Sequence, residues 1–230
     1  MYKLWIFDFD NTLARLEPEV DWAGGRLVLE PYLRSVGAPD ELFERIPRGN
    51  IPLYDAYRTI VLADGNRRRR LTELRRASEI IEKIELAGVE RAKPLDGALE
   101  TLAALKNSGA AVAIVTSNSS RTIKRWFEVN RAISADLQLD TIVGRDSGLA
   151  LKPAPDMVLR ALEILSAQPS DAAFVGDSEA DLLAAKNSGL RFYGIAASEA
   201  ARDRLLAAGA AEIYSSPAAL AIHLNLLAAR

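Results

Sequence analysis

Short apolar runs alternate with segments of helical periodicity through most of this chain. The runs with the length of buried strands are 4–7, 111–116, 141–143, 172–176, 192–196 and 212–214. Helical segments lie between the later runs, at 100–107, 122–130, 155–166 and 179–187. Alternation of this kind builds a parallel sheet with right-handed crossovers and helices on its faces. We therefore expect an α/β fold, in which ligands bind beyond the carboxyl ends of the strands.

The segment 15–93, which follows the first predicted strand, has a different character. It is rich in charged residues, and its predicted helices are 41–46, 53–63 and 71–86. In the last of these, Leu74, Ser78 and Ile81 follow helical spacing, with arginine and glutamate on the other face. We expect this segment to form a helical unit inserted into the α/β core.

Charge argues against a nucleic-acid partner. The net charge is −2, whereas a general nucleic-acid binder would need a basic surplus. The arginine run 67–70 does not alter this, because four adjacent residues of a helix point in different directions. We interpret the run as the solvated start of a helix, balanced by the acidic residues after it, Glu73, Glu79, Glu82 and Glu85.

Composition narrows the class further. The 230 residues are 49% hydrophobic, enough for one large core or for a core with a smaller second one. Cysteine is absent, which excludes disulfides, thiol catalysis and zinc–thiolate sites. The N-terminus lacks the layout of a signal peptide, and no apolar run has the roughly 20 residues that span a bilayer. We expect a soluble cytoplasmic protein with no membrane partner.

Two carboxylates, Asp8 and Asp10, end the first predicted strand. A strand has a period of two residues, so both side chains can enter one small volume at the strand end. Crowded anions repel each other unless a cation or a shared proton joins them, and Mg2+ prefers oxygen ligands of this kind. The simpler alternative is that Asp10 and Asn11 only form a turn.

A hydroxyl-rich loop, 116–120, follows the second predicted strand and opens a helix. Hydroxyls and free backbone N–H groups at a helix start form a site for a phosphate-sized anion. The alternative is that Ser119 or Ser120 caps the helix. Thr116 comes too early in the chain to be that cap.

Two later loops carry charged residues. Lys152 precedes a proline and therefore lies in an extended segment, not on a helix. Asp177 follows Gly176, which lets the backbone turn closely, so Asp177 can point toward the first acidic pair. Asp181 stands three residues after Ser178, which is the spacing of a helix capping box, so its role can be structural.

In chain order, these motifs resemble those of the haloacid dehalogenase-like (HAD) hydrolase superfamily. The motifs are the run 8–12, Thr116, Lys152 and the run 176–181, and 94–97 is similar to the start of the second core segment in the phosphoglycolate phosphatase-like branch. The resemblance implies a Rossmann-like core, residues 1–14 and 94–230, with a parallel sheet flanked by helices. It also implies a small all-helical cap domain of the C1 type, residues 15–93, inserted after the first strand.

The activity implied by the resemblance is Mg2+-dependent hydrolysis of a small phosphorylated metabolite. Asp8 would be the nucleophile and form an aspartyl-phosphate. Asp10 would protonate the leaving oxygen, deprotonate the attacking water and give its backbone carbonyl to Mg2+. Asp177 would hold the metal with Asp8, and Asp181 would support the site. Dehalogenases lack a carboxylate at the Asp10 position because a halide leaves without a proton, so Asp10 favours phosphate chemistry.

The resemblance also implies a phosphate site. Thr116 would bind the transferring phosphoryl group together with the backbone amide of Ser117, and Lys152 would neutralise its charge. Asn118 and Thr12 would complete the phosphate-binding residues. Opposing charges of this kind stabilise the equatorial oxygens of a phosphoryl group in transfer.

The substrate and some alternatives stay open. Asn11 replaces the glycine common in phosphoglycolate phosphatases, so phosphoglycolate, a sugar phosphate or a nucleotide-like substrate are all candidates. Arg15 and the loop 48–50 could reach a second anionic group, or could be solvent-exposed. A phosphosugar mutase of the same superfamily and a non-catalytic receiver-like phospho-switch are the alternative functions, although receivers lack an acid like Asp10 beside the acceptor. The protein could be a monomer or a homodimer.

Overall fold

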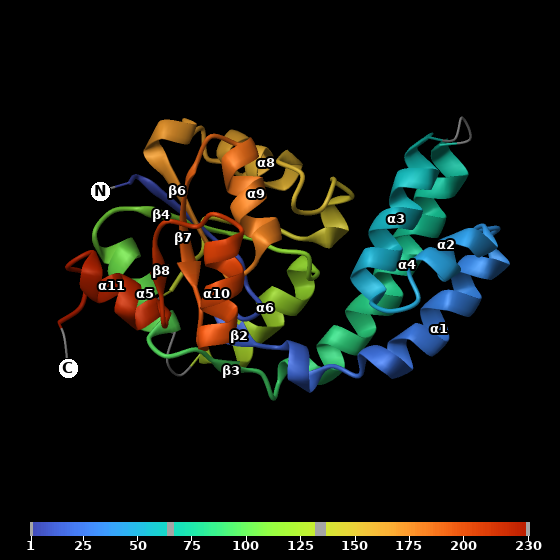
Figure 1. Cartoon of the computed structure of the whole chain (residues 1–230), viewed down its shortest axis with the longest axis horizontal. Coiled ribbons are helices and arrows are strands. Elements are labelled where there is room, and N and C mark those ends of the chain that lie inside the picture. The colour runs from blue at the N-terminus through green and yellow to red at the C-terminus, as the bar shows by residue number, and fades with distance from the viewer. Residues whose placement is uncertain (1, 64–66, 132–136, 229–230) are drawn as a thin grey trace.

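The chain forms a six-stranded parallel sheet with helices on its faces and a bundle of further helices beside it (Figure 1). The computed structural model describes residues 2–63, 67–131 and 137–228. The strand order is β5-β4-β1-β6-β7-β8. The strands are β1 (Leu4–Phe7), β4 (Ala111–Val115), β5 (Thr141–Val143), β6 (Ala172–Gly176), β7 (Arg191–Ile195) and β8 (Ile213–Tyr214). The strand pairs are parallel, which confirms the predicted α/β class.

Strand β1 lies in the middle of the sheet and is buried on both faces. Leu4 and Ile6 pack into one apolar cluster, whereas Trp5 and Phe7 pack into a second cluster on the other face. This division follows from the two-residue period of a strand. A strand covered on both faces reads as a continuous apolar run, which is why β1 was recognisable in the sequence.

Helices cover both faces of the sheet. Leu102 and Trp126 share the apolar cluster of Trp5, while Met157 and Leu182 share the cluster of Ile6. The helices of the first face are α5 (Ala98–Asn107), α6 (Ser120–Val129) and α11 (Pro217–His223). Those of the second face are α8 (Asp156–Ile164), α9 (Glu179–Asn187) and α10 (Glu199–Ala207).

A helical unit is inserted between β1 and the rest of the sheet. Its elements are η1 (Glu17–Glu19), α1 (Trp22–Ser35), α2 (Asp40–Arg45), α3 (Asn50–Ala63) and α4 (Arg67–Val89). Strand β2 (Ala14–Arg15) pairs antiparallel with β3 (Lys93–Pro94), so the chain enters and leaves the unit side by side. Among the described residues, none of the helices combines the length and the apolar character that crossing a membrane requires.

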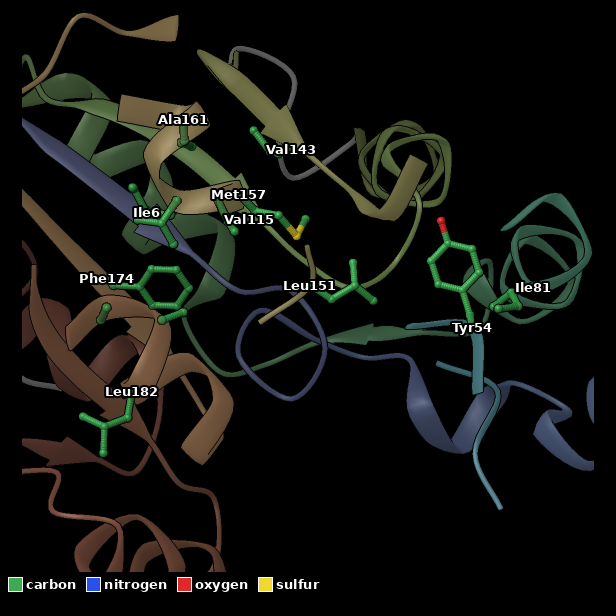
Figure 2. Close-up of a cluster of buried hydrophobic side chains, with 14 of the residues drawn as sticks. Ile6, Tyr54, Ile81, Val115, Val143, Leu151, Met157, Ala161, Phe174 and Leu182 are labelled. Carbon is green, nitrogen blue, oxygen red and sulfur yellow. The ribbon is translucent and has the colours of Figure 1, made fainter. Parts of the chain in front are cut away.

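One apolar cluster continues from the sheet into the helical unit (Figure 2). It contains Ile6 and Phe174 of the sheet, Leu151 of the loop after β5, and Tyr54 and Ile81 of the inserted helices. The inserted helices therefore pack on the core and are not merely tethered to it.

Helix α1 is the main element that the sequence did not predict. Pro31 lies inside it, and Gly24 and Gly25 lie in its first turn, so its composition is poor for a helix. The structure gives a reason for Gly25: a Cβ atom there would lie 2.3 Å from Cδ1 of Ile84, so the glycine allows α1 to approach α4 closely. Helix α4 is also longer at both ends than the predicted 71–86.

Candidate active site

The candidate site lies at the carboxyl ends of three adjacent strands. Phe7, the last residue of β1, pairs with Ile114 of β4 and Val175 of β6, so these strands end at nearly the same level. Asp8 therefore emerges between the loops that carry Thr116 and Asp177. The sheet topology accounts for the meeting of residues that are far apart in the sequence.

Three carboxylates gather at these strand ends. Asp8, Asp177 and Asp181 each offer an oxygen atom that lies within 4.8 Å of the others, a grouping that could hold a metal ion. The Nζ atom of Lys152 lies 2.5 Å from Oδ1 of Asp8 and also donates to Oδ1 of Asp181. Both ion pairs are almost completely buried.

Asp181 is held in place by the helix that it begins. Ser178 is the N-cap of α9, and its side chain and that of Asp181 form the capping box that the sequence predicted. Oδ2 of Asp181 accepts from the backbone N–H groups of Asp177 and Ser178 and from the Ser178 hydroxyl, while Oδ1 binds Lys152. Because its oxygens already bind protein donors, Asp181 fits the role of a support for Lys152 better than that of a metal ligand.

Burial raises the pKa values of Asp8 and Asp177. The pKa of Asp8 rises to about 7, because burial outweighs the nearby Lys152 ammonium. The pKa of Asp177 rises to about 8 through burial and the charges of Asp8 and Asp181. Burial alone would lower the pKa of Lys152, but the carboxylates of Asp181 and Asp8 raise it above its usual value. The three carboxylates of the cluster outnumber the single ammonium group of Lys152. A divalent cation would balance the remaining negative charge.

Asp10 lies beside the cluster, in a tight turn. Among the described residues it is not one of the grouped carboxylates; its Oδ1 accepts from the N–H groups of Leu16 and Glu17, at 2.9 and 3.0 Å. Asn11 adopts a left-handed conformation, φ 56°, which reverses the chain. Burial raises the pKa of Asp10 to about 6, against the effect of those backbone hydrogen bonds. The turn expected for Asn11 is therefore real, and it places Asp10 at the entrance to the helical unit.

The loop after β4 holds the residues predicted to bind phosphate. The Thr116 hydroxyl donates to Oδ1 of Asn118 and accepts from the Asn118 backbone N–H, so the two residues bind each other. The Ser117 carbonyl accepts from Arg145 at 2.7 Å. On the other side of the cluster, the Thr12 hydroxyl lies 3.5 Å from Oδ1 of Asp177.

The backbone N–H groups of Ser119 and Ser120, at the start of α6, are not free to bind an anion, which corrects that part of the prediction for the loop 116–120. Ser119 caps the helix through Thr122, as the alternative reading proposed. The backbone N–H of Ser119 binds Glu85, and that of Ser120 binds Asp146. Carboxylates of the protein therefore already occupy these helix-start donors.

Glu85 corrects a second prediction. It is fully buried and paired with the equally buried Arg145, instead of balancing arginines on a solvated face. Its position offered a signal: counted from Leu74, Ser78 and Ile81, it is the next residue on the apolar face of α4. Arg145 and Asp146 were not predicted as part of the site, since nothing in the local sequence marks them.

The candidate substrate contacts in and near the helical unit have different surroundings. Arg15 lines a pocket of about 520 Å³ that Asn11 and Asp177 also line. Arg48 is exposed. Asn50 is buried, and its side-chain amide donates to the Trp22 carbonyl, so it joins α3 to α1. Arg15 therefore shares a pocket with Asp177 of the carboxylate cluster.

Comparisons with known proteins find similarity at the level of family, sequence and fold. A family model described as haloacid dehalogenase-like hydrolase matches residues 5–195. Phosphoglycolate phosphatase of Aquifex aeolicus is 30% identical over 194 residues, 82% of each chain. Putative pyrophosphatase PpaX of Caldanaerobacter subterraneus is 39% identical over 96 residues, so the match spans only 42% of that protein. The crystal structure of a predicted phosphatase from Clostridium acetobutylicum shares the fold, with a TM-score of 0.65 and 24% identity over 99% of this chain and 100% of that one.

Proposed function

This chain belongs to the haloacid dehalogenase-like hydrolases, and on that premise we propose that it is a Mg2+-dependent phosphatase that works through an aspartyl-phosphate on Asp8. The relatives named as phosphatases support the hydrolysis of a phosphate ester. The observation that carries the proposal is the contact of Asp8 with Lys152 inside a cluster of carboxylates at the strand ends. Carboxylates are known acceptors of phosphoryl groups, and a cation beside them opposes the charge of the incoming phosphate.

We assign the covalent step to Asp8 and the proton transfers to Asp10. A carboxylate oxygen of Asp8 attacks phosphorus as the bond to the leaving oxygen breaks, and Asp10 gives that oxygen a proton. Water then attacks phosphorus, Asp10 takes its proton, and the bond from Asp8 to phosphorus breaks to release phosphate. A pKa of about 6 suits Asp10 for both tasks, since an acid–base group works best near the ambient pH.

We assign the metal to Asp8, Asp177 and the backbone carbonyl of Asp10. The donor set fits Mg2+, because it consists of oxygen atoms and because Asp8 and Asp177 lie in one cluster with raised pKa values. When bound, Mg2+ supplies positive charge next to the phosphoryl oxygens. Lys152, which donates to Asp8, supplies a second positive charge. Asp181 accepts from the same ammonium group and keeps the lysine in position.

We propose that the inserted helices form a cap domain, residues 15–93, over a core of residues 1–14 and 94–230. The pairing of β2 with β3 supports these boundaries, because it closes the insertion at its base. A lid over strand ends can exclude water and contact the leaving group. The residues that bind phosphate would then come from the core, namely Thr116, Ser117, Asn118, Thr12 and Lys152.

The proposal is tested by phosphate release from p-nitrophenyl phosphate with Mg2+ or EDTA. We expect Mg2+-dependent release that Asp8→Asn abolishes. Undiminished turnover by Asp8→Asn would refute the covalent mechanism, and equal turnover in EDTA would remove the metal. A panel of phosphorylated metabolites then identifies the substrate class. Phosphoglycolate and pyrophosphate come first, because the names of the relatives contain them, followed by sugar phosphates and nucleotides.

A further inference from the structure

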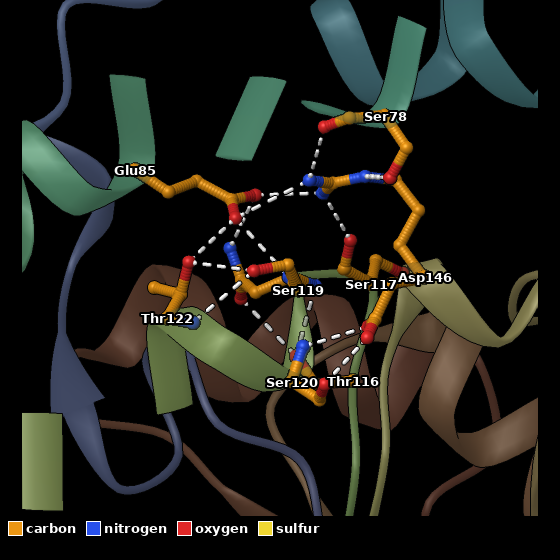
Figure 3. A network of polar contacts seen from close by, with 10 residues as sticks. Ser78, Glu85, Thr116, Ser117, Ser119, Ser120, Thr122 and Asp146 are labelled. Carbon is orange, nitrogen blue, oxygen red and sulfur yellow. Dashed lines mark hydrogen bonds and ion pairs between the residues drawn. The ribbon is translucent and has the colours of Figure 1, made fainter. Parts of the chain in front are cut away.

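A fully buried ion pair joins the helical unit to the core (Figure 3). Nη1 of Arg145, in η2 (Arg145–Ser147), lies 2.7 Å from Oε1 of Glu85 on α4, and neither side chain has any exposed surface. The same guanidinium donates to the side chain and the carbonyl of Ser78, which lies on the same face of α4 about two turns before Glu85. Arg145 is thus bound to two turns of an inserted helix.

Both members of the pair also bind the loop after β4. Arg145 donates from Nη1 to the Ser117 carbonyl at 2.7 Å. Glu85 accepts from the Asn118 side-chain amide at 3.2 Å and from the Ser119 backbone N–H at 3.1 Å. It also accepts from the Thr122 hydroxyl at 2.9 Å. Glu85 therefore lies at the N-terminus of α6, where the helix dipole favours a negative charge.

Two hydrogen-bonded routes lead from this pair to Thr116. In the first, Arg145 holds the Ser117 carbonyl, and the N–H on the opposite side of the same planar peptide, that of Asn118, donates to the Thr116 hydroxyl at 3.2 Å. In the second, Glu85 holds the Asn118 side-chain amide, whose oxygen accepts from the Thr116 hydroxyl at 3.1 Å. The Thr116 hydroxyl is therefore oriented both by the hydrogen bond that it accepts and by the one that it donates.

Stability alone does not account for such a pair. Removing two charges from water is costly, and a buried ion pair can often be replaced by apolar residues without loss of stability. Here Arg145 and Glu85 are hydrogen-bonded to groups of Ser117, Asn118 and Ser119 in the loop after β4. The pair is best explained by the geometry that it imposes on this loop.

We propose that Arg145 and Glu85 are positioning residues for the phosphoryl group, acting through Ser117 and Asn118 on Thr116. The inference rests on the proposed phosphatase function, since it assigns Thr116 to the phosphoryl group. It adds that the loop 116–118 keeps its geometry only while α4 stays docked on the core. The helical unit thus contributes to the phosphate site without touching the phosphate.

The test compares Glu85→Gln and Arg145→Lys with a matched control. Glu82→Gln lies on the same helix and also faces α6, through the exposed Arg121 at 3.4 Å. We expect the inhibition constant of inorganic phosphate to rise at least tenfold in both buried-pair variants, with kcat/KM for p-nitrophenyl phosphate falling at least as far. The control should stay within twofold of the unaltered protein. A phosphate inhibition constant unchanged in the folded buried-pair variants would overturn the inference.

A double variant separates positioning from stability. Glu85→Leu combined with Arg145→Met removes both charges, so it should fold even where a single variant does not. We expect it to retain cooperative thermal unfolding while its inhibition constant for phosphate still rises at least tenfold. Unaltered phosphate inhibition in this folded variant would reduce the pair to a structural contact and refute its positioning role.

Amide hydrogen exchange gives a readout that needs no activity. In the folded variants we expect faster exchange over 116–122 and unchanged exchange over α1 and α2. Unchanged exchange over 116–122 would refute the positioning role. If the unaltered protein hydrolyses no phosphate ester, the proposed function fails, and the exchange result still decides whether the pair holds the loop.

Discussion

The ammonium group of Lys152 lies 2.5 Å from Oδ1 of Asp8 and binds Asp181 with the same atom. One cation therefore serves two buried carboxylates, one of which is the proposed nucleophile. The contact also keeps the pKa of Asp8 lower than burial alone would make it.

Lys152→Met should lower kcat by about 10²–10³, in the range found when one charge-stabilising donor is removed from an active site. It should also lower the melting temperature, because Asp8 and Asp181 are left buried without their cation. Steady-state kinetics and thermal unfolding measure the two effects. Lys186→Met, at an exposed position on α9, is the control and should change neither. A Lys152→Met protein with normal kcat would exclude the lysine from the reaction.

Asp10→Asn should slow turnover by about 10²–10⁴, the usual contribution of general acid–base catalysis. The fold should be retained, since the amide oxygen of asparagine can still accept from the N–H groups of Leu16 and Glu17. The measurement is kcat beside a thermal melt. Asp203→Asn, an exposed change on α10, serves as the comparison. Near-normal kcat for Asp10→Asn would show that the proton is transferred by another group.

The metal-free protein should become less stable as the pH rises. The pKa values of Asp8 and Asp177 are raised from 3.8 to about 7 and about 8, so the folded protein keeps protons that the unfolded chain releases. Their contribution to the free energy of unfolding is complete below about pH 4 and is lost as the pH passes through 7 and 8.

Mg2+ should counteract this loss, because it favours the ionised carboxylates. The increase in melting temperature that MgCl2 produces should therefore grow with pH, and at 100 times its Kd the ion would add about 2.7 kcal/mol. Melting curves with EDTA and with MgCl2 between about pH 5 and pH 9 measure both effects. Asp177→Asn should flatten the pH dependence. A Mg2+ effect that does not vary with pH would argue against these ligands.

Ser178→Ala should impair activity as well as stability. The hydroxyl of Ser178 caps α9 and donates to Asp181, which holds Lys152. Loss of a helix cap costs about 1 kcal/mol. Ser216→Ala removes the N-cap of α11 and should cost a similar amount with no change in kcat. Equal kcat values for both variants would show that the cap does not influence the lysine.

The strands and the residues at their ends were predictable because their signals are local. The apolar run of β1, the two acids after it and the Ser178–Asp181 spacing can each be read within a few residues. Sheet topology then brings them together, since neighbouring parallel strands end at the same edge. The meeting of Asp8 with Asp177 in one cluster agrees with that prediction.

Other features depended on partners far away in the chain. Glu85 looked solvated because its partner, Arg145, lies 60 residues later. Helix α1 was not predicted because Gly25 and Pro31 disfavour a helix locally, whereas in the structure Gly25 allows close approach to Ile84 of α4 and α1 packs into the apolar cluster. In each case a tertiary contact outweighed the local preference.

A shared carboxylate also limits how this protein can change. Asp181 is at once the capping residue of a helix and the partner of the lysine in the site. A substitution of Asp181 that changed the position or charge environment of Lys152 would also weaken the capping of α9. A substitution that strengthened the helix would likewise alter the contact with Lys152. Efforts to engineer a more heat-resistant or a faster variant are therefore better directed at positions where these two traits can vary separately.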